Sequence, residues 1–141
     1  HMAKKGAIVT AADKNPNAVR NAIENADINE IKMKVVQSDL FSNINECFDV
    51  ITFNPPYLPN NEIKDVAWDG GKEGIEIAER FMKDAGDYLK RDGRVYLLLS
   101  TLGNVKKFID DFRPFYEFRE LGRLPLFFEQ LIAYEIKRHH P

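Results

Sequence analysis

The residues best suited to chemistry are Asn54-Pro55-Pro56-Tyr57, which directly follow the apolar run Phe48–Phe53. That run is short and rich in β-branched and aromatic residues, which predicts a buried strand. The two prolines end the strand because they lack an N–H donor and restrict the backbone. We therefore expect an amide side chain, backbone carbonyls and an aromatic ring at the carboxyl end of a strand, where open α/β sheets bind their ligands.

These residues can orient an amine or amide nitrogen. The side-chain oxygen of Asn54 and the carbonyl of Pro55 can each accept one N–H, which favours the positive charge that develops on the nitrogen during group transfer. Tyr57 can pack on a planar amide or base. A proline loop that merely ends a strand has the same residue types, so the rest of the chain has to distinguish the two interpretations. The sequence shows no Ser/His/Asp set and no spacing typical of metal ligands.

Two acidic residues follow the two preceding predicted strands. Asp13 follows the apolar run Gly6–Ala12. The run Lys32–Gln37 ends at Ser38-Asp39. An acid after a strand of a Rossmann-type unit commonly accepts hydrogen bonds from ribose hydroxyls, which suits Asp13. Asp39 can accept from the exocyclic amine of adenine, with Leu40 or Phe41 packing nearby. A lone acid more often caps the next helix. Asp13, Asp39 and Asn54, each at the end of a predicted strand, together favour a nucleotide-like ligand.

The elements that position these residues alternate between strands and helices. Helices are predicted from Asn15-Pro16 to about Ala26, over a long stretch that includes Ala78–Leu89 and is closed by Arg91-Asp92-Gly93, and over Val105–Phe112. The remaining predicted strands are Arg94–Leu99, Tyr116–Leu121 and Phe127–Ile136, the last two joined by a turn at Gly122–Pro125. This order predicts an α/β fold with a Rossmann-like, doubly wound, mostly parallel sheet and an antiparallel C-terminal strand. The aromatic residues that we expect in its core are Phe112, Phe115, Tyr116, Phe118, Phe127 and Phe128.

Length and composition limit the functional classes. A chain of 141 residues predicts a single domain, which we place over residues 3–138. The net charge of −2 argues against a nucleic-acid binder that works by charge alone. No stretch approaches the ~20 apolar residues of a membrane span, so no membrane partner is expected. One cysteine excludes an intrachain disulfide and fits a reducing compartment, so we expect a cytoplasmic protein.

Three motifs together resemble class I S-adenosylmethionine-dependent methyltransferases. They are Asp13-Lys14-Asn15-Pro16, Ser38-Asp39-Leu40-Phe41, and Phe48–Ile51 with Asn54-Pro55-Pro56-Tyr57. More narrowly, the chain resembles the HemK-related glutamine methyltransferases that modify translation release factors. The run Ala67–Gly74 is similar to the archaeal and eukaryotic branch of that family.

The resemblance implies a function and a set of site residues. It implies S-adenosylmethionine as cofactor and the side-chain amide of a release-factor glutamine as acceptor. Its catalytic residues would be Asn54, Pro55, Pro56 and Tyr57, and its cofactor-binding residues Asp13, Lys14, Asp39, Leu40 and Asn54. Trp68 and Asp69 would lie in the loop that covers the substrate, and no metal is expected. The partners implied are the release factor and a small zinc-binding activator subunit.

Other acceptors and another class of function stay open. The same Asn-Pro-Pro-Tyr group serves methyltransferases of exocyclic base amines in RNA or DNA, whose target base must be single-stranded or flipped out. Lysine could also be the acceptor. A catalytically inactive fragment that retains only a partner-binding surface is the third hypothesis.

The chain departs from the family pattern at its beginning. None of the eight glycines forms a G-x-G or G-x-x-G after an N-terminal strand, so the first strand and the Gly-rich turn that hold the cofactor are missing from this sequence. We therefore expect an N-terminally truncated domain with weak or absent cofactor binding. Unpaired strand edges are costly to bury, so we also expect a homodimer through exposed strand edges, another form of strand complementation, or a rearranged sheet.

Overall fold

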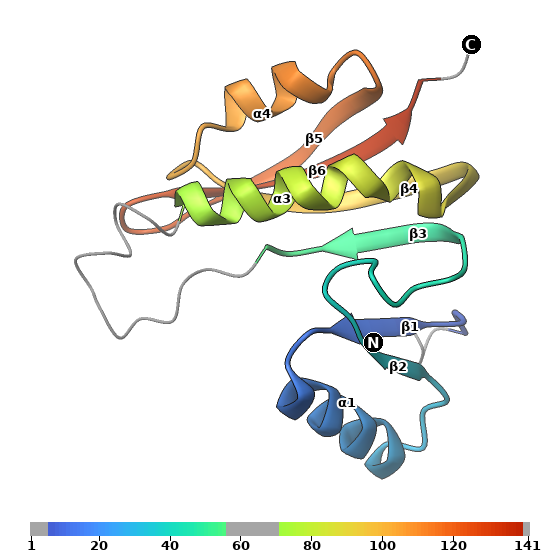
Figure 1. The fold of residues 1–141 in the computed structure, drawn as a ribbon. Helices are drawn as coiled ribbons and strands as arrows, with labels where there is room; N and C mark the ends of the chain where they lie inside the picture. The colour runs from blue at the N-terminus through green and yellow to red at the C-terminus, as the bar shows by residue number, and fades with distance from the viewer. Residues whose placement is uncertain (1–5, 56–70, 140–141) are drawn as a thin grey trace. The chain divides into compact units, whose positions relative to one another are not determined.

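The computed structural model describes residues 6–55 and 71–139. The chain divides into two compact units, His1–Glu46 and Cys47–Pro141. Each unit has its own hydrogen-bonded sheet, with strand order β1-β2 in the first and β3-β4-β6-β5 in the second (Figure 1). Within the described residues, no helix is both long and apolar enough to cross a bilayer.

The first unit is a β-α-β arrangement. Its elements are β1 (Thr10–Asp13), α1 (Pro16–Ile28) and β2 (Lys34–Gln37), and the two strands are parallel. The helix begins as predicted, because the Asn15 side chain accepts a hydrogen bond from the N–H of Asn17 at 2.8 Å and proline occupies the first turn. The strand begins at Thr10 rather than Gly6, and Ile8 is fully exposed.

The second unit is a mixed four-stranded sheet with two helices. In chain order its elements are β3 (Phe48–Phe53), α3 (Gly71–Ala85), the short helix η3 (Gly86–Tyr88), β4 (Leu89–Ser100), α4 (Val105–Phe112), β5 (Tyr116–Pro125) and β6 (Gln130–Arg138). Strands β3 and β4 are parallel, whereas β6 runs antiparallel to both β4 and β5. The C-terminal strand is therefore the antiparallel one, as predicted.

The core of this unit lies between the helices and one face of the sheet. Phe81 of α3 stacks on Phe53 of β3, with ring centroids 4.4 Å apart. Phe108 of α4 is completely buried and contacts Phe112 and Phe118 at centroid distances of 5.0 and 6.2 Å. The strands contribute the buried side chains Val95, Leu97, Leu99, Ile132, Tyr134 and Ile136.

The fold class is α/β, as predicted. The described strands form two sheets, however, and not the single sheet that we predicted. In the described residues no ladder joins β1 to β3, and β3 pairs only with β4. The pattern of apolar residues identifies strands, but it does not specify which strands become neighbours.

The predicted end of the long helix is wrong. The helix ends at Ala85, and Arg91-Asp92-Gly93 lie inside β4, where the pairing with β3 shifts its register. Arg138 stabilises this segment, because its guanidinium donates to the carbonyls of Gly86 and Lys90 at 2.8 and 2.9 Å. Gly93 permits it, because a Cβ there would lie 3.0 Å from the carbonyl oxygens of Phe48 and Lys90.

The predicted turn between the last two strands is also wrong. Pro125 pairs with Gln130, and the N–H of Leu126 donates to the carbonyl of Glu129 at 2.7 Å, so the turn comes after Gly122–Pro125. Three of the aromatic residues predicted for the core are exposed, namely Phe115 at 65%, Phe127 at 90% and Phe128 at 83%. Phe112 and Tyr116 are buried and Phe118 is half-buried.

Candidate functional site

At the end of β3, an exposed amide side chain stands next to a buried proline. Pro55 is fully buried, and a Cβ placed on Gly74 would lie 4.0 Å from the Cβ of Pro55, so the first turns of α3 lie directly beside it. Asn54 is exposed, and its side chain makes no hydrogen bond within the described residues. The buried proline therefore holds the strand end while the amide is presented to solvent. The other predicted residues of this group, Pro56, Tyr57, Trp68 and Asp69, lie outside the described residues.

The first unit brings its two predicted acids to neighbouring strand ends. The N–H of Ser38 donates to the carbonyl of Asp13 at 2.9 Å, so the chain that leads into Asp39 is bound to the end of β1. One carboxylate oxygen of Asp13 accepts from the N–H of Asn15 at 2.8 Å. Its second oxygen makes no hydrogen bond to the part of the chain that the structure describes. Asp13 thus orders the start of α1 and retains capacity for a ligand.

A compact turn fixes the backbone around Asp39 and Leu40. The Ser38 hydroxyl donates to the carbonyl of Leu40 at 2.8 Å and accepts from the N–H of Asn43 at 2.9 Å. Leu40 adopts a left-handed backbone conformation with φ of 53°, and its side chain is half-buried. Asp39 is exposed, as is Lys14. Asp13, Lys14, Asp39 and Leu40 therefore belong to one unit, whereas Asn54 belongs to the other.

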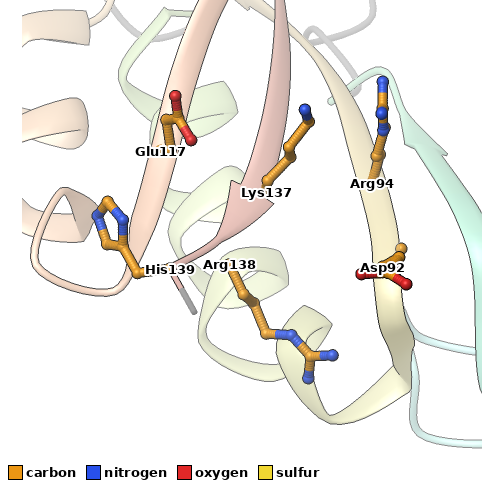
Figure 2. Close-up of a pocket in the computed structure, with 7 residues that line it drawn as sticks. Asp92, Arg94, Glu117, Lys137, Arg138 and His139 are labelled. Carbon is orange, nitrogen blue, oxygen red and sulfur yellow. The ribbon is translucent and has the colours of Figure 1, made fainter. Parts of the chain in front are cut away.

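A polar pocket of about 280 Å³ lies at the other end of the second unit, away from Asn54. Figure 2 shows Lys137 between Glu117 and Arg94 on three adjoining strands, with Arg138 pointing away from it. The cations of this pocket already have protein partners. Arg138 binds backbone carbonyls, and Arg94 and Lys137 lie 3.2 and 3.9 Å from Glu135. The remaining lining residues are Asp92, Gly93 and His139. We therefore look for candidate site residues at the strand ends of each unit rather than in this pocket.

A buried carboxylate organises the sheet face that carries these cations. Glu135 is 4% exposed, and its carboxylate accepts from the Tyr96 hydroxyl at 2.9 Å and pairs with Arg94 and Arg119, each at 3.2 Å. The hydrogen bond from Tyr96, followed by the positive charges of Arg119 and Arg94, holds the pKa of Glu135 below its ordinary value of 4.5. Lys137 adds a more distant positive charge.

This arrangement predicts a pH-dependent contribution to stability. Because the pKa of Glu135 is lower in the folded chain, the carboxylate stabilises the fold above the ordinary value of 4.5, and that contribution is lost as pH falls through the folded-state pKa. Glu135→Gln should lower the melting temperature near neutral pH and lose less on acidification than the wild type. Melting curves between about pH 3 and pH 7 measure this difference. Glu117→Gln, on the same face but exposed, is the matched control. Parallel curves for wild type and Glu135→Gln would contradict the prediction.

Sequence reasoning missed two features of the second unit. The cluster around Glu135 depends on the antiparallel register of β6, which pairs Tyr96 with Glu135 and Arg119 with Glu135. No local sequence pattern predicts the register of β6 with its two neighbouring strands. The exposed Phe127-Phe128 turn was missed because its apolar residues are also typical of a buried strand. In the described residues, no group of three or more His, Cys, Asp or Glu could hold a metal.

Comparison with known proteins identifies a family that this chain matches. The chain matches the family described as "Methyltransferase small domain" over residues 1–121. It is 42% identical over 139 residues to a protein of Methanocaldococcus jannaschii named "Putative protein N5-glutamine methyltransferase", covering 93% of this chain and 71% of that protein. It is 34% identical over 100 residues to the release factor glutamine methyltransferase of Streptococcus pneumoniae, covering 63% of this chain and 36% of the relative.

A solved structure supports the fold. A 16S rRNA methyltransferase of T. thermophilus, in complex with AdoMet and guanosine, matches with a TM-score of 0.67 at 18% identity, covering 95% of this chain and 33% of that one. The chain therefore spans about a third of this structure and of the streptococcal relative.

Proposed function

Because the chain belongs to the methyltransferase small domain family, we propose that it takes part in S-adenosylmethionine-dependent methylation of a protein glutamine at its side-chain nitrogen. The observation that carries this proposal is the 42% identity, over 93% of the chain, to the M. jannaschii protein with that name. The exposed Asn54 beside the buried Pro55 supports it, because this pair can accept the N–H groups of an amide.

The residues of the first unit fit the nucleoside half of the cofactor. Ribose hydroxyls and the adenine amine are hydrogen-bond donors, and Asp13 and Asp39 present exposed carboxylates at neighbouring strand ends. The half-buried side chain of Leu40 offers an apolar contact for the ring, and we retain Lys14 as a cofactor-binding residue from the resemblance. When bound, S-adenosylmethionine supplies an electrophilic methyl group.

The residues of this chain act on the acceptor. An amide nitrogen is a poor nucleophile, because its lone pair is delocalised into the carbonyl. Hydrogen bonds from the amide N–H groups to the Asn54 side chain and the Pro55 carbonyl orient that nitrogen and favour the positive charge that grows on it. We propose that Pro56 and Tyr57 complete this group and that Trp68 and Asp69 help cover the substrate.

A translation release factor is the substrate that we propose, since the streptococcal relative is named for that activity. A small zinc-binding activator subunit and a second copy of this chain, paired through an exposed strand edge, remain predictions. Size-exclusion chromatography with light scattering tests both partners.

A methyl-transfer assay with competing acceptors tests the proposal. The chain is incubated with radiolabelled methyl donor and, separately, with a purified archaeal release factor, its variant lacking the target glutamine, and ribosomal RNA. We expect label only in the unaltered release factor, at glutamine by mass spectrometry, and only at a donor concentration high enough to offset the weak cofactor binding that the sequence predicts. Label in RNA or at lysine would contradict the proposal. So would no transfer at high donor concentration while the M. jannaschii relative is active in the same assay.

A further inference from the structure

The turn between β5 and β6 exposes a run of apolar residues, Leu124-Pro125-Leu126-Phe127-Phe128, which we name the apolar turn. Phe127 and Phe128 are 90% and 83% exposed, and Leu124 is 57% exposed. Hairpin turns are usually built from Gly, Asn or Asp. Here the rings of Phe127 and Phe128 are exposed to solvent, so they do not contribute the stabilisation that burial would provide. Such a patch is typical of an interaction surface.

Several hydrogen bonds hold the apolar turn firmly. The N–H of Leu126 donates to the carbonyl of Glu129 at 2.7 Å, and the Glu129 carboxylate accepts from the Ser100 hydroxyl. Thr101 and Gln130 exchange two more bonds, at 2.8 and 2.9 Å. The rings of Phe127 and Phe128 lie edge to face, 4.6 Å apart. The surface is therefore preformed rather than a loose loop.

The apolar turn lies at the same end of the sheet as Asn54. Phe53 pairs with Leu97 of β4, and β4 continues to Ser100, beside the first residues of β6 (Figure 1). Asn54 is level with Ala133 of β6, two strands away and five residues from Phe128, so strand spacings of roughly 5 Å and a rise of roughly 3.3 Å per residue place Phe127 and Phe128 about 20 Å from Asn54. An extended polypeptide covers that distance in about six residues.

The charges around the apolar turn favour a polypeptide over a nucleic acid. The turn itself has no charged residue. Arg123, the cation directly before the turn in the sequence, is bound to both oxygens of Glu120 at 2.8 to 3.0 Å and to Gln130 at 3.1 Å. The next residue along the chain, Glu129, is acidic. A phosphate backbone finds no available cation on this turn, whereas apolar side chains find a neutral surface.

We propose that the apolar turn docks an apolar stretch of the polypeptide substrate, about six residues from the glutamine presented to Asn54. This inference rests on the proposed function for the identity of the acceptor. The docking itself is a property of the turn. It makes Phe127 and Phe128 specificity-determining residues that bind substrate without touching the reacting nitrogen.

Peptide binding tests this proposal without depending on methyl transfer. The probes are three synthetic peptides with one central glutamine in a serine background. One has leucines about six residues from the glutamine, one has them directly beside it, and one has none. The proteins are the wild type, the double variant Phe127→Ala/Phe128→Ala, and Phe115→Ala, which removes an exposed ring at the opposite end of β5. Fluorescence anisotropy measures the affinities, and melting curves confirm that each variant is folded.

The wild type should bind the first peptide about tenfold more tightly than the other two, and the double variant should lose that preference. Phe115→Ala should keep it. Equal binding of all three peptides by the wild type, or a preference that survives in the double variant, would overturn the docking proposal. So would tight binding of single-stranded RNA that the double variant loses. If the preference is present but no peptide is methylated, docking stands and the proposed function fails. If peptides are methylated without any preference, the proposed function stands and docking fails.

Discussion

Replacing Asn54 by alanine is expected to reduce kcat for methyl transfer by about 10²- to 10³-fold, the usual effect of removing one preorganised hydrogen-bonding group that stabilises charge in a transition state. The amide at the end of β3 is exposed in the part of the chain that the structure describes, whereas the adjacent Pro55 is buried. The fold should therefore survive the substitution. Radiolabel transfer to the release factor gives kcat, and a melting curve shows that stability is unchanged.

Two further measurements separate a role at the acceptor from a structural one. Asn54→Ala should affect kcat more than it affects the affinity for the methyl donor, which equilibrium binding reports. Asn21→Ala, an exposed residue of α1, is the matched control and should keep wild-type kcat. If Asn54→Ala lowered kcat only two- or threefold, roughly the size of an ordinary surface effect, the assignment of Asn54 to the acceptor would be wrong.

Replacing Phe108 by alanine is expected to lower the free energy of unfolding by about 3–5 kcal/mol. Phe108 is completely buried and lies against the rings of Phe112 and Phe118, so its loss leaves a cavity between α4 and the sheet. Domains of this size have a total stability of roughly 5–15 kcal/mol, so the change removes a large part of it. Urea unfolding followed by circular dichroism measures the difference.

Phe115→Ala is the control for this second prediction. It deletes the same side chain seven positions along the sequence, where the ring is 65% exposed. Its effect should stay within about 0.5 kcal/mol. Similar losses from the two substitutions would mean that α4 does not pack on the sheet as the structure shows.

The elements near the candidate site follow closely from local sequence. The strand Phe48–Phe53 has the predicted bounds, and α1 begins at the predicted cap. Both depend on residues within a few positions, namely Pro55 after the strand and the Asn15 side chain at the start of its own helix. Such short-range signals are readable without knowledge of the fold.

Predictions from local sequence were wrong where residues distant in the chain determine the secondary structure. The segment after Ala85 becomes a short helix and a strand, with Arg138, far along the chain, bound to its carbonyls. Phe127 and Phe128 look like strand residues, yet the pairing of Pro125 with Gln130 leaves them in a turn. In both places the competing local preference is weaker than hydrogen bonds that only the assembled sheet can form.

The sequence by itself determined the α/β class, the positions of Asp13, Asp39 and Asn54 at strand ends, and the resemblance to methyltransferases, because these depend on residue type and short spacing. The tertiary structure alone decided which strands pair, which carboxylate is buried and which aromatic rings stay in water. Strand register brings together residues that are distant in the chain, such as Arg94, Arg119 and Glu135. A linear pattern has no signal for that proximity, since it arises only when three strands align side by side.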